Sequence, residues 1–82
     1  MELKVGQVVK SIAGHDKGDL RMIAGFEHEK VLVCDGKHRK LEKPKCKNPK
    51  HIEETEMFLE PDSMATNKML RKTLNKIANP GG

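Results

Sequence analysis

Four residues with metal-binding side chains lie close together in the middle of the chain. Cys34, His38, Cys46 and His51 follow one another with the spacing C-x3-H-x7-C-x4-H. Thiolates and imidazoles are the usual ligands of tetrahedral structural zinc sites. The spacing between the two cysteines matches no common zinc ribbon or finger, and an apolar-flanked cysteine such as Cys34 is typical of a core. We therefore expect no metal, no other cofactor and no Cys34–Cys46 disulfide in a reducing compartment.

The other polar residues show no catalytic arrangement. Neither Ser11 nor Ser63 has the pattern of histidine and acid that is typical of an activated nucleophile. A chain of 82 residues also has little material with which to enclose a deep substrate pocket. The sequence therefore predicts a protein that is not an enzyme.

Positive charge is concentrated in one segment. Residues 1–36 carry five Lys/Arg and six acids, whereas residues 37–51 carry seven Lys/Arg and one acid, Glu42. Residues 52–62 hold five acids and no base, and residues 63–82 hold four bases. Contacts between Lys or Arg and phosphates supply most non-specific affinity for nucleic acids, through counterion release. The distribution therefore predicts a polyanion-binding surface built mainly from residues 37–51.

The elements that must position these charges begin with three short apolar runs, at residues 8–13, 20–26 and 31–34. The runs are rich in β-branched residues and bounded by glycine or charge, which is typical of strands. Their short connections predict antiparallel neighbours, because a parallel crossover needs about a dozen residues or more. Gly25 is a candidate for a bulge or bend. Residues 39–41 are a candidate edge strand.

The C-terminal part predicts a helix. Residues 61–63 are Pro-Asp-Ser, a helix start signal. Leu70, Leu74 and Ile77 follow at positions i, i+4 and i+7, and residues 79–82 end the pattern with Pro and Gly. An isolated helix of this length is only marginally stable in water, so we expect it to dock on the strands. The chain therefore divides into a sheet domain, residues 1–60, and a helix with a tail, residues 61–82.

The loop Gly14-His15-Asp16-Lys17-Gly18, with the strands on either side, resembles a KOW motif. Two further segments are Gly6-Gln7-Val8-Val9 and Val31-Leu32-Val33, the second of which precedes Asp35-Gly36. Both resemble segments of large-subunit ribosomal proteins of the eukaryotic and archaeal type, which have an N-terminal KOW barrel. They also resemble segments of the short bacterial relatives of these proteins. The basic run of residues 39–45, closing on Lys50-His51, is similar to the end of that barrel. Asp19-Leu20-Arg21 departs from the universal bacterial type. The resemblance spans residues 5–52.

This resemblance implies a mainly β fold, namely a small SH3-like β-barrel of about five antiparallel strands. The C-terminal α-helix predicted above follows this barrel and lies outside the resemblance. It also implies a cytoplasmic RNA-binding protein associated with the ribosome or ribosomal RNA, with ribosomal proteins as further candidate partners. No apolar run approaches the about 18 residues of a membrane span. The family's loop contacts carry over to His15, Asp16, Lys17 and Gly18, with Lys10 and Arg21 as flanking candidates. The basic segment adds Lys37, His38, Arg39, Lys40, Lys43, Lys45, Lys47 and Lys50.

Two other functions stay open from the sequence. A KOW-type protein-interaction module of the transcription or translation machinery would use the acidic residues 53–62 beside a basic helix. An SH3-like module that binds duplex DNA would use the same basic segment. Because few aromatic residues are present for base stacking, we expect recognition of RNA shape and phosphates rather than reading of single strands. His15, His38 and His51 are the candidates to stack on a base or bind it by a hydrogen bond.

Overall fold

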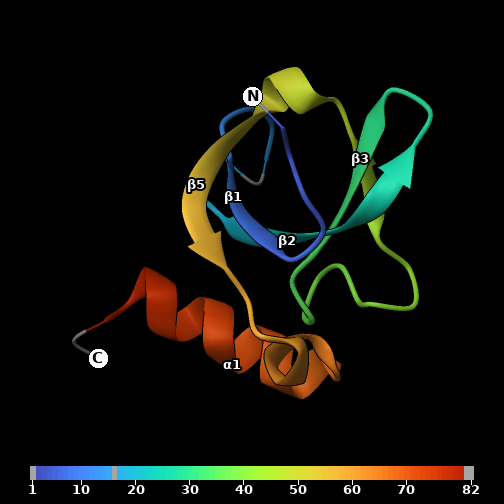
Figure 1. Ribbon diagram of the computed structural model, residues 1–82. Helices are drawn as coiled ribbons and strands as arrows, with labels where there is room; N and C mark the ends of the chain where they lie inside the picture. Colours follow the sequence, from blue (N-terminus) through green and yellow to red (C-terminus); the bar gives the residue numbers. More distant parts are fainter. Residues whose placement is uncertain (1, 16, 81–82) are drawn as a thin grey trace.

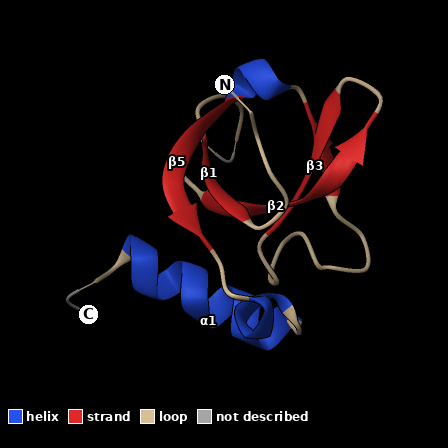
Figure 2. Ribbon diagram, viewed as in Figure 1, coloured by secondary structure: helices blue, strands red, loops and turns tan. Residues whose placement is uncertain are grey.

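The computed structural model describes residues 2–15 and 17–80, so Asp16 of the predicted loop lies outside the described residues. Five strands form one antiparallel sheet in the order β4-β3-β2-β1-β5. Their bounds are Gln7–Ser11 (β1), Leu20–Glu27 (β2), Lys30–Cys34 (β3), Lys45–Lys47 (β4) and Ile52–Phe58 (β5). The 3₁₀ turn η1, Pro49–His51, joins β4 to β5, and a second turn, η2 (Pro61–Met64), precedes the helix α1, Asn67–Ala78 (Figures 1 and 2). Among the described residues, no helix has the length and apolar character needed to cross a membrane.

The strands predicted at residues 8–13, 20–26 and 31–34 are confirmed as β1, β2 and β3. Val8 lies opposite Met22 in the β1–β2 pair, and β2 pairs with β3 in the same antiparallel sense. The β2–β3 register shifts between Ile23 and Gly25. Gly25 therefore marks the irregularity that the sequence predicted.

The predicted edge strand at residues 39–41 is wrong, because these residues form bends and turns. The edge strand β4 lies further along the chain, between Pro44 and Pro49. A proline interrupts a sheet least when it flanks a short edge strand, since no ladder hydrogen bond then depends on its missing N–H. The basic segment therefore supplies both a long loop and the edge of the sheet.

The predicted start of the helix is also wrong. Residues 61–63 belong to η2, and α1 begins at Asn67. Thr66 is the N-cap, and its hydroxyl accepts a hydrogen bond of 3.1 Å from the N–H of Met69. The cap satisfies one of the N–H groups that the first turn of a helix leaves unpaired.

The sheet buries apolar side chains on both of its faces, which is why the alternation in β1 does not identify a single core face. On one face an outer cluster brings together the sheet and α1 through Val8, Met22, Cys34, Leu70 and Leu74. On the opposite face an inner cluster contains Val9, Ile23, Val31, Val33 and Ile52. The helix therefore docks on the sheet, as the sequence predicted, and the strands wrap around the inner cluster (Figure 1).

A short connection draws the two edge strands toward each other. Adjacent strands lie about 4.8 Å apart, so the edges of a flat five-stranded sheet would be about 19 Å apart. The connection from Lys47 to Ile52 contains η1, and a 3₁₀ segment rises only about 2 Å per residue. The Nζ of Lys47 also donates a hydrogen bond of 2.9 Å to the Oγ of Ser11 on β1. The sheet is therefore strongly curled.

Candidate nucleic-acid interface

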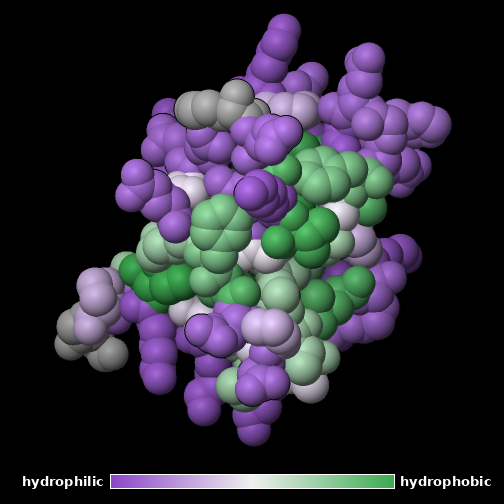
Figure 3. All heavy atoms as spheres, viewed as in Figure 1, coloured by the Kyte–Doolittle hydropathy of each residue, from purple (hydrophilic) through white to green (hydrophobic). Residues whose placement is uncertain are grey.

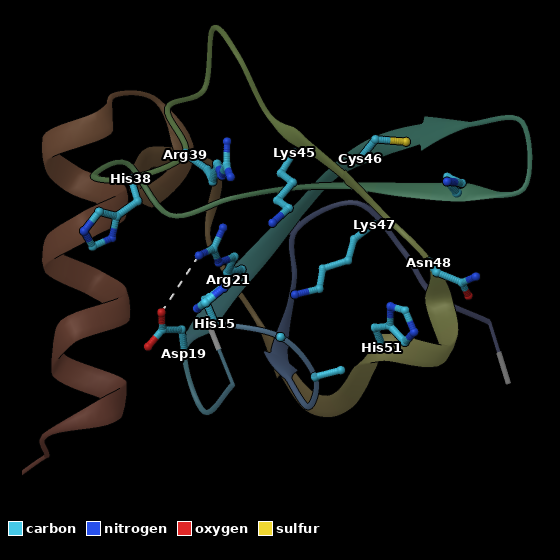
Figure 4. Close-up of a pocket in the computed structure, with 13 residues that line it drawn as sticks. His15, Asp19, Arg21, His38, Arg39, Lys45, Cys46, Lys47, Asn48 and His51 are labelled. Atoms are coloured by element: carbon cyan, nitrogen blue, oxygen red, sulfur yellow. Dashed lines mark ion pairs between the residues drawn. The ribbon is translucent and has the colours of Figure 1, made fainter.

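A cleft of about 930 Å³ opens where the inner face of the sheet meets the loops, and we call it the central cleft. The described residues of its lining include five Lys/Arg, three His and one acid: Arg21, Lys30, Arg39, Lys45, Lys47, His15, His38, His51 and Asp19. Figure 4 shows the side chains of Arg21, Lys45 and Lys47 directed into the same space. The lining is therefore strongly positive, and it draws on segments that are far apart in the sequence.

Strand pairing places these basic side chains on the inner face. Lys45 lies opposite Val33, and Lys47 lies opposite Val31. Residues directly opposite each other in a ladder point to the same face, and both valines belong to the inner cluster. Arg21 lies two positions before Ile23 on β2 and so shares the face of that isoleucine. The inner face of the sheet is therefore apolar at the inner cluster and basic where it lines the central cleft.

Asp35 holds the loop that carries the next basic residues. Its Oδ1 accepts hydrogen bonds from the N–H groups of Lys37 (2.9 Å) and Arg39 (2.8 Å). Its Oδ2 lies 4.0 Å from the Nη2 of Arg21 and 3.8 Å from the Nδ1 of His38. A single carboxylate therefore orders the loop of residues 35–39 and ties it to β2.

Arg21 and Lys47 are nearly buried, with 4 % and 5 % of their surfaces exposed. The Nη2 of Arg21 lies 3.9 Å from Asp19, which is the one acid among the described residues that line the central cleft (Figure 4, dashed line). The sequence predicted Arg21 and Lys47 as phosphate contacts, but the structure places both among protein groups. Their charge adds to the positive potential of the cleft, whereas the exposed Lys30 and Arg39 are free to reach a phosphate.

A second hollow, of about 640 Å³, adjoins the central cleft, and we call it the loop hollow. It shares His38, Arg39, Lys45 and Cys46 with the central cleft. It adds three further residues that the sequence predicted, Lys37, Lys40 and Lys43. The predicted basic segment therefore lines two continuous hollows rather than a dispersed surface.

Glu42, an acid in the lining of the loop hollow, is held by the helix. The Nδ2 of Asn67 donates a hydrogen bond to the Oε1 of Glu42, and the Oδ1 of Asn67 accepts one of 2.7 Å from the N–H of Leu41. The hydrogen bond from Asn67 lowers the pKa of Glu42. Asn67 therefore fastens the basic loop to the first turn of α1.

Four predicted contacts, Lys10, Lys17, Gly18 and Lys50, line neither the central cleft nor the loop hollow. The N–H of Gly18 donates to the carbonyl of Ser11 at 2.7 Å, and the N–H of Lys17 donates to the carbonyl of Gly14 at 3.3 Å. These amides close the turn and are not aimed at a ligand. Of the loop residues that were predicted and that the structure describes, His15 lines the central cleft.

Lys30 and Asn48 line the central cleft but were not among the predicted contacts. Lys30 comes from the nearly neutral N-terminal part and opens β3, and no local pattern distinguishes it. Asn48 precedes η1, and its Oδ1 accepts a hydrogen bond of 2.9 Å from the N–H of Lys50. An Asn-Pro pair is a helix-start signal that indicates such a turn. The pairing of β3 with β4 is what brings Lys30 to the cleft.

The two cysteines lie in different environments. Cys34 is buried in the outer cluster, whereas Cys46 is exposed on β4, and both are free thiols. Burial raises the pKa of the Cys34 thiol to about 11, with a smaller contribution from Asp35 and an opposing one from Arg21. Within residues 2–15 and 17–80, no three His, Cys, Asp or Glu side chains are grouped so as to hold a metal ion.

Comparison of the sequence with models of protein families and with curated proteins found no match. The charge and geometry of the two hollows are therefore the observations that bear on function.

Proposed function

We propose that the protein binds structured RNA through its phosphates, on or near the ribosome. The observation that carries this proposal is the described lining of the central cleft, in which five Lys/Arg and three His accompany one acid that lies 3.9 Å from Arg21. A cationic hollow of this kind attracts a polyanion and gains affinity from released counterions. In this proposal Lys30, Arg39 and Lys45 contact phosphates, and the three histidines stack on bases or bind them by hydrogen bonds.

We further propose that the curled sheet is an SH3-like barrel of the KOW type. Support comes from the strand order, the 3₁₀ turn between the edge strands and the bond between Lys47 and Ser11. Gly14 and Gly18 bound the first loop with φ angles of +83° and +95°, a conformation that favours glycine. In this proposal the protein is cytoplasmic, its RNA is ribosomal, and ribosomal proteins are its neighbours.

The salt dependence of RNA binding tests the proposal. Affinity for a structured ribosomal RNA fragment should fall with salt, with a log–log slope of about −0.7 to −0.9 for each phosphate contact. The single variants Lys30→Glu and Arg39→Glu should each weaken binding and reduce the size of that slope by about 1. Lys68→Glu is the matched control, because Lys68 is exposed and lines neither hollow. Affinity that is independent of salt, or an equal loss in the control, would contradict the proposal.

A second pair of variants separates the geometry of the cleft from the charge pattern of the sequence. Lys10 and Lys30 are both exposed, but only Lys30 lines the central cleft. We expect Lys30→Glu to weaken RNA binding more than Lys10→Glu, measured in the same titration. The opposite order would move the interface from the central cleft to the outer side of β1.

A protein-interaction module is the second candidate, and one observation favours it. The two phenylalanines are the only aromatic residues among Phe, Tyr and Trp, and Phe26 and Phe58 are 50 % and 54 % exposed. Figure 3 shows apolar side chains exposed across the middle of one face. Half-exposed aromatics are typical anchors of protein interfaces. If the protein binds RNA through the central cleft, the double variant Phe26→Ser/Phe58→Ser should leave RNA affinity unchanged. Binding to a protein that does not depend on salt, together with no binding to RNA, would favour the second function.

A further inference from the structure

A third hollow, of about 300 Å³, lies between α1 and the loop of residues 35–39, and we call it the helix hollow. Its basic residues are Lys37, Arg71 and Lys72, and it shares His38 and Asp19 with the central cleft. The side chain of His38 is 68 % exposed. The positive lining of the central cleft therefore continues past His38 onto the helix.

The two described acids of the helix hollow differ in exposure: the side chain of Asp19 is 55 % exposed, and that of Asp35 is 13 % exposed. Asp19 and Asp35 line it, and both lie within 4.0 Å of the Nη2 of Arg21. Asp35 also accepts hydrogen bonds from two N–H groups of its own loop. The three basic residues of the hollow are all exposed. An anion that enters the hollow therefore meets three exposed cations and one exposed carboxylate, Asp19, while Asp35 is engaged by its own loop.

The helix is held at a fixed position relative to the central cleft. Gly36 packs so closely against α1 that an added Cβ would clash with the carbonyl oxygen of Asn67 and approach the N–H of Arg71 to 3.1 Å. Asn67 binds the N–H of Leu41, and Leu70 is fully buried against the sheet. The contacts of Gly36, Asn67 and Leu70 therefore set where the helix hollow lies relative to the central cleft.

We propose that Lys37, Arg71 and Lys72 form a second phosphate-binding site across His38 from the central cleft, and that the ligand of the two sites together is double-stranded RNA. This inference rests on the proposed function of the central cleft. Two rigidly spaced sites gain most from a ligand whose phosphates are themselves fixed, because neither partner then loses freedom on binding. Proteins recognise the RNA duplex mainly by shape and by contacts to phosphates and ribose hydroxyls. A flexible single strand gains less from such spacing.

Fluorescence anisotropy with an RNA stem, a single strand of the same length and a DNA duplex tests this site. Arg71→Glu/Lys72→Glu should weaken binding to the RNA stem by roughly tenfold to a hundredfold at constant salt. Lys68→Glu/Lys76→Glu is the matched control, since it makes the same charge change on the same helix at residues that line none of the three hollows. The control pair should weaken stem binding much less, and circular dichroism should show the same helix content in both double variants.

Each of the other possible outcomes would contradict a specific part of the proposal. Equal losses in the two double variants would overturn the second site. Equal losses for stem and single strand would overturn the assignment of the ligand as double-stranded RNA. Stem binding that depends on Lys30 and Arg39 but not on Arg71 and Lys72 would also overturn it and leave the proposed function intact. No affinity of the unaltered protein for either RNA would overturn the proposed function itself. Equal affinity for the DNA duplex would overturn the assignment of the ligand as RNA.

Discussion

Lys47 on β4 and Ser11 on β1 are joined by a hydrogen bond of 2.9 Å, although β3 and β2 lie between their strands in the sheet. Both residues are buried, with 5 % and 1 % of their surfaces exposed. One lysine of the basic segment therefore reaches across the inside of the curled sheet and links its edge to β1. Lys47 serves the fold, whereas exposed neighbours such as Lys43 remain available to a ligand.

Replacing Lys47 should therefore cost stability. We expect Lys47→Ala to lower the free energy of unfolding by about 1–3 kcal/mol, because a buried hydrogen bond from a charged group is lost. Lys43→Ala, at an exposed position, should change it by no more than about 0.5 kcal/mol. Urea denaturation of the two variants measures the difference. Equal stabilities would show that the bond between Lys47 and Ser11 contributes nothing to the curled sheet.

The close contact between Gly36 and α1 predicts a difference between two glycine variants. Gly36 and Gly18 have φ angles of +79° and +95°, so alanine at either position should cost about 1–2 kcal/mol of backbone strain. At Gly36 alone the new Cβ would also meet the backbone of α1, whereas nothing lies within 4 Å of it at Gly18. We expect Gly36→Ala to cost about 1–3 kcal/mol more, as overpacked sites do.

Urea denaturation gives the two stabilities, and hydrogen exchange locates the damage. The amides of α1 should exchange faster in Gly36→Ala than in Gly18→Ala, because only the Cβ added at residue 36 would clash with the backbone of α1 and displace the helix from the sheet. Similar stabilities and similar exchange in α1 would mean that the helix moves without cost. That result would also contradict the claim that the contact at Gly36 sets the position of the helix hollow relative to the central cleft.

The two thiols should react at very different rates. The exposed Cys46 should be modified rapidly by a disulfide reagent such as DTNB, whereas the buried Cys34 should react only after unfolding. Cys46→Ser should abolish the fast reaction, and bound RNA should slow it, because Cys46 lines both the central cleft and the loop hollow. Two fast thiols in the native protein would contradict the burial of Cys34 against α1.

Stability should also fall at alkaline pH because of Cys34. Below about pH 9 the thiol is neutral in both the folded and the unfolded chain, so its contribution is fully present. Above that pH the unfolded thiol ionises first, since burial raises the folded pKa to about 11, and the contribution is lost as pH rises through this range. The pH dependence of the unfolding free energy should be less steep in Cys34→Ala; an unchanged slope would be evidence against the raised pKa.

The hydrogen bond from Asn67 to Glu42 predicts a shift that NMR can measure. In Asn67→Ala the pKa of Glu42 should rise, because the main cause that lowers it is removed. Since the folded pKa is the lower one, the contribution of this bond to stability is present above the ordinary pKa of Glu42 and is lost as pH falls through the folded value. Glu42→Gln assigns the titrating signal. An unchanged titration in Asn67→Ala would show that the basic loop is not tied to the helix at this point.

Local patterns were sufficient to predict β1, β2, β3 and the apolar stripe of α1. Each of these elements carries its own signal, such as β-branched runs bounded by glycine or the spacing of Leu70 and Leu74. The strands β4 and β5 carry no such signal, because β4 is Lys-Cys-Lys and β5 contains three glutamates. They form because β3 and β1 offer unpaired edges to which they add.

The sequence by itself determined that positive charge gathers in residues 37–51 and that an amphipathic helix follows. Only the tertiary structure decided which cations share a surface. It brought Lys30 into the central cleft, set Arg21 and Lys47 among protein partners and placed Arg71 and Lys72 beyond His38. The physical reason is that distance along a chain does not specify the direction of a side chain. Strand register, the curl of the sheet and the position of α1 on the sheet set those directions. All three depend on contacts between residues far apart in sequence.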